Sequence, residues 1–292
     1  TYESFEGYYF NANVTGPVSD NAAFRLFGSY RTRDGFMKIR SGPAQTERDG
    51  NAKEGWNFRG QFQWKPSESI SVRFIADVGH KDDECCYAAI WRPGGTGVSG
   101  TEYNTLLSIM GYPVTGNTNT VEDQVGWANR EHPQIVDEYG FSGEVNADLG
   151  WGDFTSITAY RYWKLAGGSD ADYTAADILW TDPDVGFQNF KTFTQEFRLT
   201  GSTDWVDWLV GVFYGNETLD RETSTLNGTD TEAWLSRFNL SPVSNTASRA
   251  FLAGVQGPTR RPLSTPYAGG NTHALGTGLH DYYNQTSESI AL

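Results

Sequence analysis

Residues 56–65 read WNFRGQFQWK, in which aromatic residues or glycine alternate with polar or charged residues. Successive side chains of a β-strand point to opposite faces, so this stretch predicts a strand with one apolar face and one polar face. Its length is about twice that of an ordinary globular strand. Strict alternation over about ten residues is typical of strands that cross a membrane as part of a β-barrel.

The same alternation recurs along the chain and predicts nine strands. The predicted ranges are 5–18, 22–33, 55–65, 69–80, 136–149, 154–165, 191–200, 207–219 and 281–292. The fold class expected from them is all-β, with an antiparallel, up-and-down transmembrane sheet.

The connections between these strands are alternately short and long. The short ones, near 16–21, 66–69, 150–153 and 201–205, are rich in turn-forming Gly, Pro, Ser and Asp, whereas the long ones cover about 35–54, 81–135, 166–190 and 220–280. Every second connection of an up-and-down sheet lies at the same end, so all the long loops are expected at one end. Outer-membrane barrels show this asymmetry, with short periplasmic turns and long extracellular loops.

The order of the turns also predicts that this is an incomplete arc of a barrel. The first predicted strand leads into a short turn, so it begins at the long-loop end, whereas a complete single-chain barrel normally starts in the periplasm. Nine is an odd number, and an open sheet would leave unpaired edges in a bilayer. We therefore expect the chain to be part of a larger barrel.

The composition fits a strand-rich protein and excludes some other classes. The chain has 36 acidic and 22 basic residues and a net charge of −14, which argues against a nucleic-acid-binding surface. Aromatic residues make up 14% of the chain. The sequence contains no run of about 18 apolar residues and therefore predicts no transmembrane helix. The mean hydropathy of −0.53 is compatible with a barrel, because only alternate residues of its strands need to be apolar.

Several motifs resemble those of TonB-dependent outer-membrane receptors. The segment NVTGPVSD at 13–20, followed by FRL at 24–26 and YRTRDGF at 30–36, resembles the first barrel hairpin of that family. The segment RGQFQWKP at 59–66 is similar to the next hairpin. Later strands of the family are similar to TSITAYR at 155–161, QEFRL at 195–199 and NQTSESIA at 284–291. The order and spacing of these motifs extend the resemblance along nearly the whole chain.

The resemblance implies a 22-stranded barrel closed by an N-terminal plug domain, of which residues 1–292 would be about strands 2 to 10. The plug and the C-terminal strands would lie outside this chain. It implies a Gram-negative outer-membrane receptor that imports a scarce, bulky ligand, by family most often an iron chelate such as a siderophore. The implied partners are the lipid bilayer, the protein's own plug, the TonB–ExbB–ExbD complex and that small-molecule ligand. It implies no enzyme activity and no cofactor.

Charged residues on the polar faces are expected to face the barrel lumen, where they would pack against the plug and one another, with ligand contact as the alternative. They are Arg25, Arg31, Arg59, Arg73, Glu138, Glu144, Arg161, Glu196 and Arg198.

Aromatic residues on the apolar faces are expected to form girdles at the two membrane interfaces, although a sugar-stacking platform is also open. They are Tyr30, Trp56, Trp64, Tyr139, Tyr160 and Trp208. Candidates for stacking a ligand lie in the long loops: Tyr87, Trp91, Tyr103, Tyr112, Trp180 and Trp234, with Arg92 for an anionic ligand.

The remaining reactive residue types predict no catalytic or metal site. Cys85 and Cys86 are adjacent and allow a vicinal disulfide, a bond to a partner or an inert loop feature. His80 with three nearby acidic residues is a poor calcium site, because no glycine-anchored loop accompanies it. A passive porin, or a secreted β-rich module that binds or hydrolyses glycans, remains an alternative.

Overall fold

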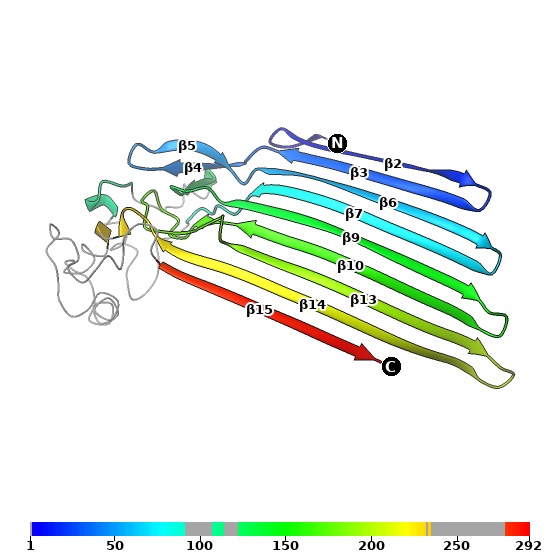
Figure 1. The fold of residues 1–292 in the computed structure, drawn as a ribbon. Helices are drawn as coiled ribbons and strands as arrows, with labels where there is room; N and C mark the ends of the chain where they lie inside the picture. Colours follow the sequence, from blue (N-terminus) through cyan, green and yellow to red (C-terminus); the bar gives the residue numbers. More distant parts are fainter. Residues whose placement is uncertain (1, 91–106, 114–121, 232, 235–277) are drawn as a thin grey trace.

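The computed structural model describes residues 2–90, 107–113, 122–231, 233–234 and 278–292. Nine long strands make up its main sheet, and each pairs antiparallel with the next long strand along the chain (Figure 1). They are β2 (Gly7–Ser19), β3 (Ala22–Arg33), β6 (Lys53–Ser67), β7 (Ile70–Glu84), β9 (Pro133–Asp148), β10 (Asp153–Gly167), β13 (Phe187–Ser202), β14 (Asp207–Asn227) and β15 (Gly278–Ala291). The nine predicted strands and their up-and-down order are confirmed.

Most strands extend further toward the long connections than the alternation predicts. β14 has 21 residues and continues to Asn227, whereas the apolar pattern ends near Leu219. Its pairing with β15 continues as far as Leu226. Backbone hydrogen bonds hold the strands together beyond the apolar band, where the side chains on both faces are polar and alternation no longer reveals a strand.

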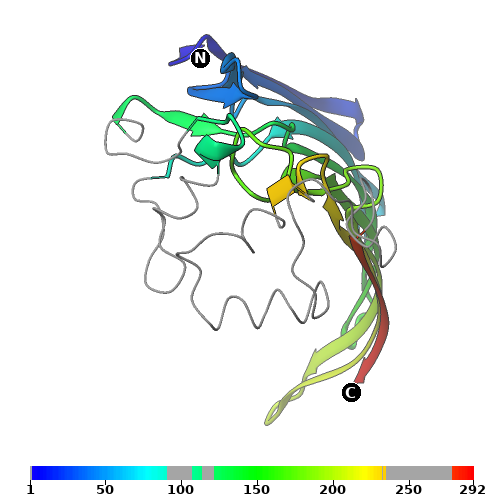
Figure 2. The same ribbon diagram turned by 90° about the vertical axis from the view of Figure 1, so that its left-hand side faces the viewer.

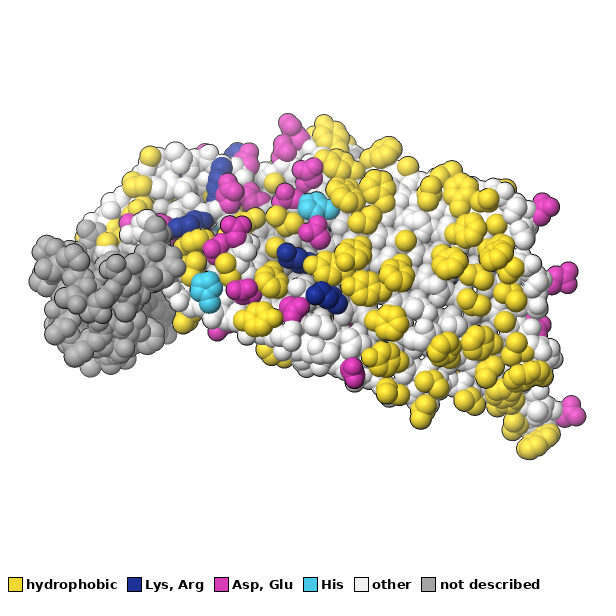
Figure 3. All heavy atoms as spheres, in the orientation of Figure 1, with side chains coloured by type: hydrophobic (Ala, Val, Ile, Leu, Met, Phe, Trp, Pro, Cys, Tyr) yellow, Lys and Arg dark blue, Asp and Glu magenta, His cyan; other side chains and the backbone are white. Residues whose placement is uncertain are grey.

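The sheet is curved, with a convex face and a concave face (Figure 2). Its convex face is densely covered with apolar side chains (Figure 3). Phe58, Phe141 and Val210 on this face are 57%, 56% and 62% exposed. An exposed apolar surface of this extent does not suit water. The six predicted girdle aromatics all lie on this convex face, because they share the register of Phe58 and Val210.

A cluster of polar side chains around Gln195 lies on the apolar convex face. The Gln195 side-chain oxygen accepts a hydrogen bond from Thr158 Oγ1 at 2.5 Å, and its Nε2 donates to Ser156 Oγ at 3.2 Å and to the Glu196 carbonyl at 3.1 Å. All the hydrogen-bonding atoms of the Gln195 amide are therefore used within the sheet. This satisfies the condition for placing an amide against lipid.

Removing only Thr158 from this cluster is expected to destabilise the sheet in a bilayer. Thr158→Val leaves the Gln195 oxygen without a donor and should cost about 1–2 kcal/mol of unfolding free energy. The double variant Thr158→Val/Gln195→Leu removes both groups and should recover most of that loss. Urea unfolding in lipid vesicles measures both variants, and equal stability of the single variant and wild type would contradict the prediction.

The long connections form a second, compact region at one end of the sheet, which we call the loop core. In the loop core, β4 (Met37–Ser41) pairs antiparallel with β5 (Thr46–Gly50) and parallel with β8 (Val125–Trp127). β11 (Ser169–Asp170) pairs with β12 (Leu179–Thr181), which extends the main sheet beside β14. Outside the loop core, the short strand β1 (Tyr2–Glu3) pairs with β2.

Most fully buried apolar side chains of the described residues belong to this loop core and not to the sheet. One cluster contains Met37, Ile39, Tyr87 and Ala128, and another contains Leu107, Ala176 and Ile178. Among the described residues, no helix is long and apolar enough to cross a membrane.

Candidate ligand-binding mouth and lumen wall

The nine charged residues predicted to face the lumen all lie on the concave face. The cross-strand registers place them opposite to the convex aromatic residues on every strand concerned. Several form ion pairs there: Arg73 with Glu144, Arg161 with Asp77, and Arg198 Nε with Glu196 Oε1 at 2.9 Å. Among the described residues, Arg25 and Arg59 form no ion pair. The concave face is therefore a charged wall with cations left to meet another surface.

Gly140 lets one of these ion pairs cross a strand. Asp77 on β7 and Arg161 on β10 are both paired in register with Gly140 on β9, which lies between them. A Cβ atom at Gly140 would be only 2.8 Å from Arg161 Nη1. The missing side chain therefore gives the guanidinium a path over β9 to the carboxylate.

Gly140→Val is expected to push Arg161 aside and break its pair with Asp77. The steric cost should be about 1–3 kcal/mol, while the loss of an exposed ion pair adds less than about 1 kcal/mol. Gly143→Val is the matched control, because a Cβ there meets Phe74 on the convex face at 3.4 Å, which is an ordinary contact. Urea unfolding should separate the two variants, and equal midpoints would refute this role of Gly140.

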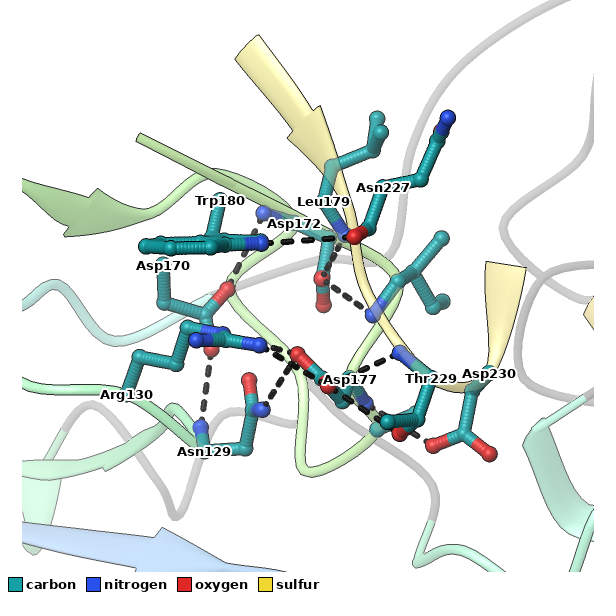
Figure 4. A network of polar contacts seen from close by, with 12 residues as sticks. Asn129, Arg130, Asp170, Asp172, Asp177, Leu179, Trp180, Asn227, Thr229 and Asp230 are labelled. Carbon is teal, nitrogen blue, oxygen red and sulfur yellow. Dashed lines mark hydrogen bonds and ion pairs between the residues drawn. The ribbon is translucent and has the colours of Figure 1, made fainter. Parts of the chain in front are cut away.

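A network of carboxylates holds the loop core together (Figure 4). Asp177 accepts hydrogen bonds from Arg130 Nε at 2.8 Å and Nη2 at 2.9 Å, and from Asn129 Nδ2 at 2.9 Å. It also accepts bonds from the Thr229 amide at 2.8 Å and hydroxyl at 3.0 Å. Burial alone would raise the pKa of Asp177, but the bonds from Arg130, Thr229 and Asn129 outweigh it and hold the pKa below its usual value. Asp177 thus joins three connections that are far apart in sequence.

Two further aspartates shape the connection between β10 and β13. Asp170 is fully buried and accepts bonds from the amides of Asn129 at 2.8 Å, Asp172 at 3.0 Å and Tyr173 at 2.9 Å. Asp172 accepts bonds from the amides of Thr174 at 3.0 Å, Ile178 at 3.1 Å and Leu179 at 2.9 Å. Burial raises the pKa of both carboxyls, and the charge of Asp172 raises the pKa of Asp170 further, against the opposing effect of these amide donors. Both side chains replace backbone partners that this irregular connection lacks.

The predicted ligand-stacking residues that the structure describes are used largely inside the loop core. Tyr87 is 4% exposed, and its hydroxyl donates to Glu84 at 2.5 Å. Tyr112 donates to Asp230 at 2.6 Å, and Trp234 packs against the cluster around Leu107. Tyr87 therefore presents almost no free surface to a ligand, and Tyr112 and Trp234 are partly buried by packing in the loop core. Trp91, Arg92 and Tyr103 lie outside the described residues.

Trp180 has a different environment, beneath a cation. The Arg130 guanidinium lies 4.0 Å from the centre of the Trp180 ring, and Trp180 Nε1 donates to the Asn227 carbonyl at 3.3 Å. Arg130 is held at the same time by Asp177. The ring therefore supports an ion pair, and it is only half-buried.

A cavity of about 360 Å³ lies where the loop core meets the concave face. Cys85 and Cys86, joined by a disulfide, lie on its wall with His132 and Tyr173, and Gln188 and Arg221 reach it from the sheet. The His132 ring is 4.1 Å from the Tyr87 ring. Burial, with the nearby Arg48, lowers the pKa of His132 to about 4, so the imidazole is neutral.

Sequence reasoning missed Arg130, His132, Asp170 and Asp177 as organising residues. The segment SDADYTAAD at 169–177 carried a usable signal, since closely spaced aspartates favour turns that bind backbone amides. Nothing in the sequence indicates that Arg130 would meet Asp177.

Similarity to known proteins is found at the level of structure. No protein-family model and no curated protein matches the chain. The ferric yersiniabactin uptake receptor FyuA from Yersinia pestis matches with a TM-score of 0.55 and 13% identity, over 77% of this chain and 30% of that chain. The ferripyoverdine receptor of the outer membrane of Pseudomonas aeruginosa matches with a TM-score of 0.49 and 11% identity, over 98% of this chain and 33% of that chain.

The first of these matches shows the fold. The chain has the fold of part of the wall of this receptor's barrel. It spans about a third of the length of the receptors that it matches. The predicted fold class, an open arc of an antiparallel barrel, is confirmed.

Proposed function

We propose that the protein carrying this chain is a TonB-dependent receptor of a Gram-negative outer membrane. It binds a bulky ligand, by family an iron chelate, at the mouth beside the loop core, and imports it with energy from the TonB–ExbB–ExbD complex. Residues 1–292 are then about strands 2 to 10 of a 22-stranded barrel, and the charged concave face packs against a plug domain. The barrel fold and the charged concave face support this proposal.

The slope of the apolar band on the convex face carries the membrane part of the proposal. Toward the end of the sheet that carries the long connections, which we call the upper end, the band ends at Trp56 on β6 and at Ile290 on β15. Through the successive cross-strand pairs, Ile290 is level with Phe62 on β6. Phe62 lies six residues below Trp56 on that strand. The upper edge of the band therefore descends six residues over the six strand-to-strand steps from β6 to β15.

This descent gives the tilt of the strands in a membrane. With about 3.3 Å per residue and about 4.8 Å between strands, it corresponds to a slope of about 35°. The upper edge of a lipid-facing band is level with the membrane, so the strands must be inclined by about that angle. Strands of transmembrane barrels are tilted by about 35–45°. A soluble sheet has no reason to keep such an oblique edge.

An uptake assay in whole cells tests the transport part. Cells that express the full gene should accumulate a radiolabelled iron chelate, and a protonophore or deletion of TonB should abolish the accumulation. Uptake that continues unchanged without proton-motive force would instead identify a passive pore. Recovery of the protein in the aqueous fraction after lysis without detergent would reject the membrane assignment itself.

A further inference from the structure

Basic side chains are distributed very unequally between the two faces of the sheet. By register, Lys and Arg residues of the nine long strands lie on the concave face, with the exceptions of Lys164 on β10 and Lys191 on β13. These two face the convex side. The exceptions come from adjacent strands, although they are far apart in sequence.

The two lysines are diagonal neighbours on the upper edge of the apolar band. Lys164 pairs in register with Asn189, and Lys191 pairs with Tyr162, so the two side chains start about 7 Å apart. Tyr162, which lies beside Lys191 and two residues below Lys164, has its ring stacked on Tyr139 at 4.9 Å. Two flexible ammonium groups can therefore converge on one point just above an aromatic pair.

Two aspartates flank the lysines, and each also contacts another group. Asp137, opposite Lys164 in the register, contacts His80 Nδ1 at 2.7 Å. Asp220 is 3.8 Å from Lys191 Nζ and also accepts a hydrogen bond from Asn284. Lys164 Nζ lies 5.7 Å from the Phe187 ring, and in the part of the chain that the structure describes it has no ion pair. The two lysines are balanced in number by these two carboxylates, but Asp137 is held by His80, so the Lys164 ammonium is left for one compact anion beside Lys191.

We propose that Lys164 and Lys191 bind the phosphate group of an outer-leaflet lipid, whose apolar portion packs on Tyr162 and Tyr139. The inference rests on the proposed function, because it requires the convex face to be in the membrane. At the edge of a hydrocarbon band a lysine normally extends into water. Lipid headgroup phosphates lie at that depth, and a phosphate supplies the negative partner that the Lys164 ammonium lacks.

Lipid binding by the purified full-length protein in a neutral detergent tests the proposal. The probes are phosphatidic acid and the diacylglycerol with the same acyl chains, and native mass spectrometry reads their retention. Lys164→Gln/Lys191→Gln should weaken phosphatidic acid binding by about 30-fold, or about fivefold for each lysine, and should leave diacylglycerol unchanged. Lys53→Gln/Lys81→Gln makes the same charge change on the concave face and should leave both lipids unchanged.

The outcomes distinguish this inference from the proposed function. Equal retention of phosphatidic acid by wild type and the convex double variant, in a protein that fractionates with the outer membrane, overturns the lysine site alone. Equal loss in the concave control also overturns it, because total charge would then explain the binding. A protein that never reaches the outer membrane rejects the proposed function before any lipid is added.

Discussion

Val212→Arg is expected to cost about 2–4 kcal/mol of folding free energy in a bilayer and to prevent accumulation in the outer membrane. Val212 lies on the convex face of β14, within the apolar band, and is 43% exposed. A guanidinium at this depth cannot reach water without distorting the bilayer, and the neighbouring convex residues offer it no carboxylate.

Thr194→Arg is the matched control for this prediction. Thr194 lies one strand away on β13 but faces the concave side, because it pairs in register with Gly215 and Ala159. The new cation there can remain hydrated or join the charged wall. Urea unfolding in vesicles and the amount of protein in outer-membrane fractions measure both variants. Equal tolerance of arginine on the two faces would contradict the assignment of the convex face to lipid.

Asp177→Asn is expected to loosen the loop core while the sheet remains intact. The Asp177 and Arg130 side chains are 15% and 28% exposed, so their pair is largely shielded from water. Removing the charge leaves the Arg130 guanidinium and the Thr229 amide facing a poorer acceptor, at a cost of about 2–4 kcal/mol. Hydrogen exchange in residues 168–182 should accelerate by about 30-fold or more, whereas β6 and β7 should be unaffected. Asp184→Asn, an exposed site in the same connection, is the control with the same charge change.

The same ion pair predicts an acid-sensitive step. The folded pKa of Asp177 is below its unfolded value of about 3.9, so its stabilisation is present above that pH and is lost as pH falls through the folded pKa. Asp170 and Asp172 have raised pKa values and act in the opposite direction, because stability is lost as pH rises above their unfolded pKa of about 3.9. Of these three aspartates, only Asp177 therefore weakens protection against hydrogen exchange as pH falls below about 4. The acid step should be absent in Asp177→Asn, and its persistence there would exclude Asp177 as its source.

The sheet could be predicted because its signal is short in range. Alternation over residues 56–65 fixes which side chains of β6 face lipid, and a turn of a few residues fixes the register with β7. Strand ends were less predictable, since β14 continues beyond the apolar band to Asn227 through backbone pairing alone.

The loop core could not be predicted, because contacts between distant segments build it. β5 reads TERDG and has no alternation, and β8 lies parallel to β4 from a segment more than 80 residues later. The bonds from Arg130 to Asp177 and from Thr229 to Asp177 span 47 and 52 residues. Tyr87 looks like a free aromatic in the sequence, yet Asn51 and Glu84 hold it inside the loop core. Local pattern carries no information on such pairs.

Lipid accessibility along β6 tests the central claim most directly. Single cysteines with nitroxide labels at positions 56 to 65, in the protein reconstituted into vesicles, would be probed with oxygen, which concentrates in lipid, and with a water-soluble nickel chelate. The even positions, which include Phe58 and Phe62 on the convex face, should be accessible to oxygen and shielded from nickel, and the odd positions, which include Arg59, should show the reverse. A profile without this two-residue period, or nickel access at Phe58 and Phe62, would contradict the assignment of this sheet to a membrane barrel.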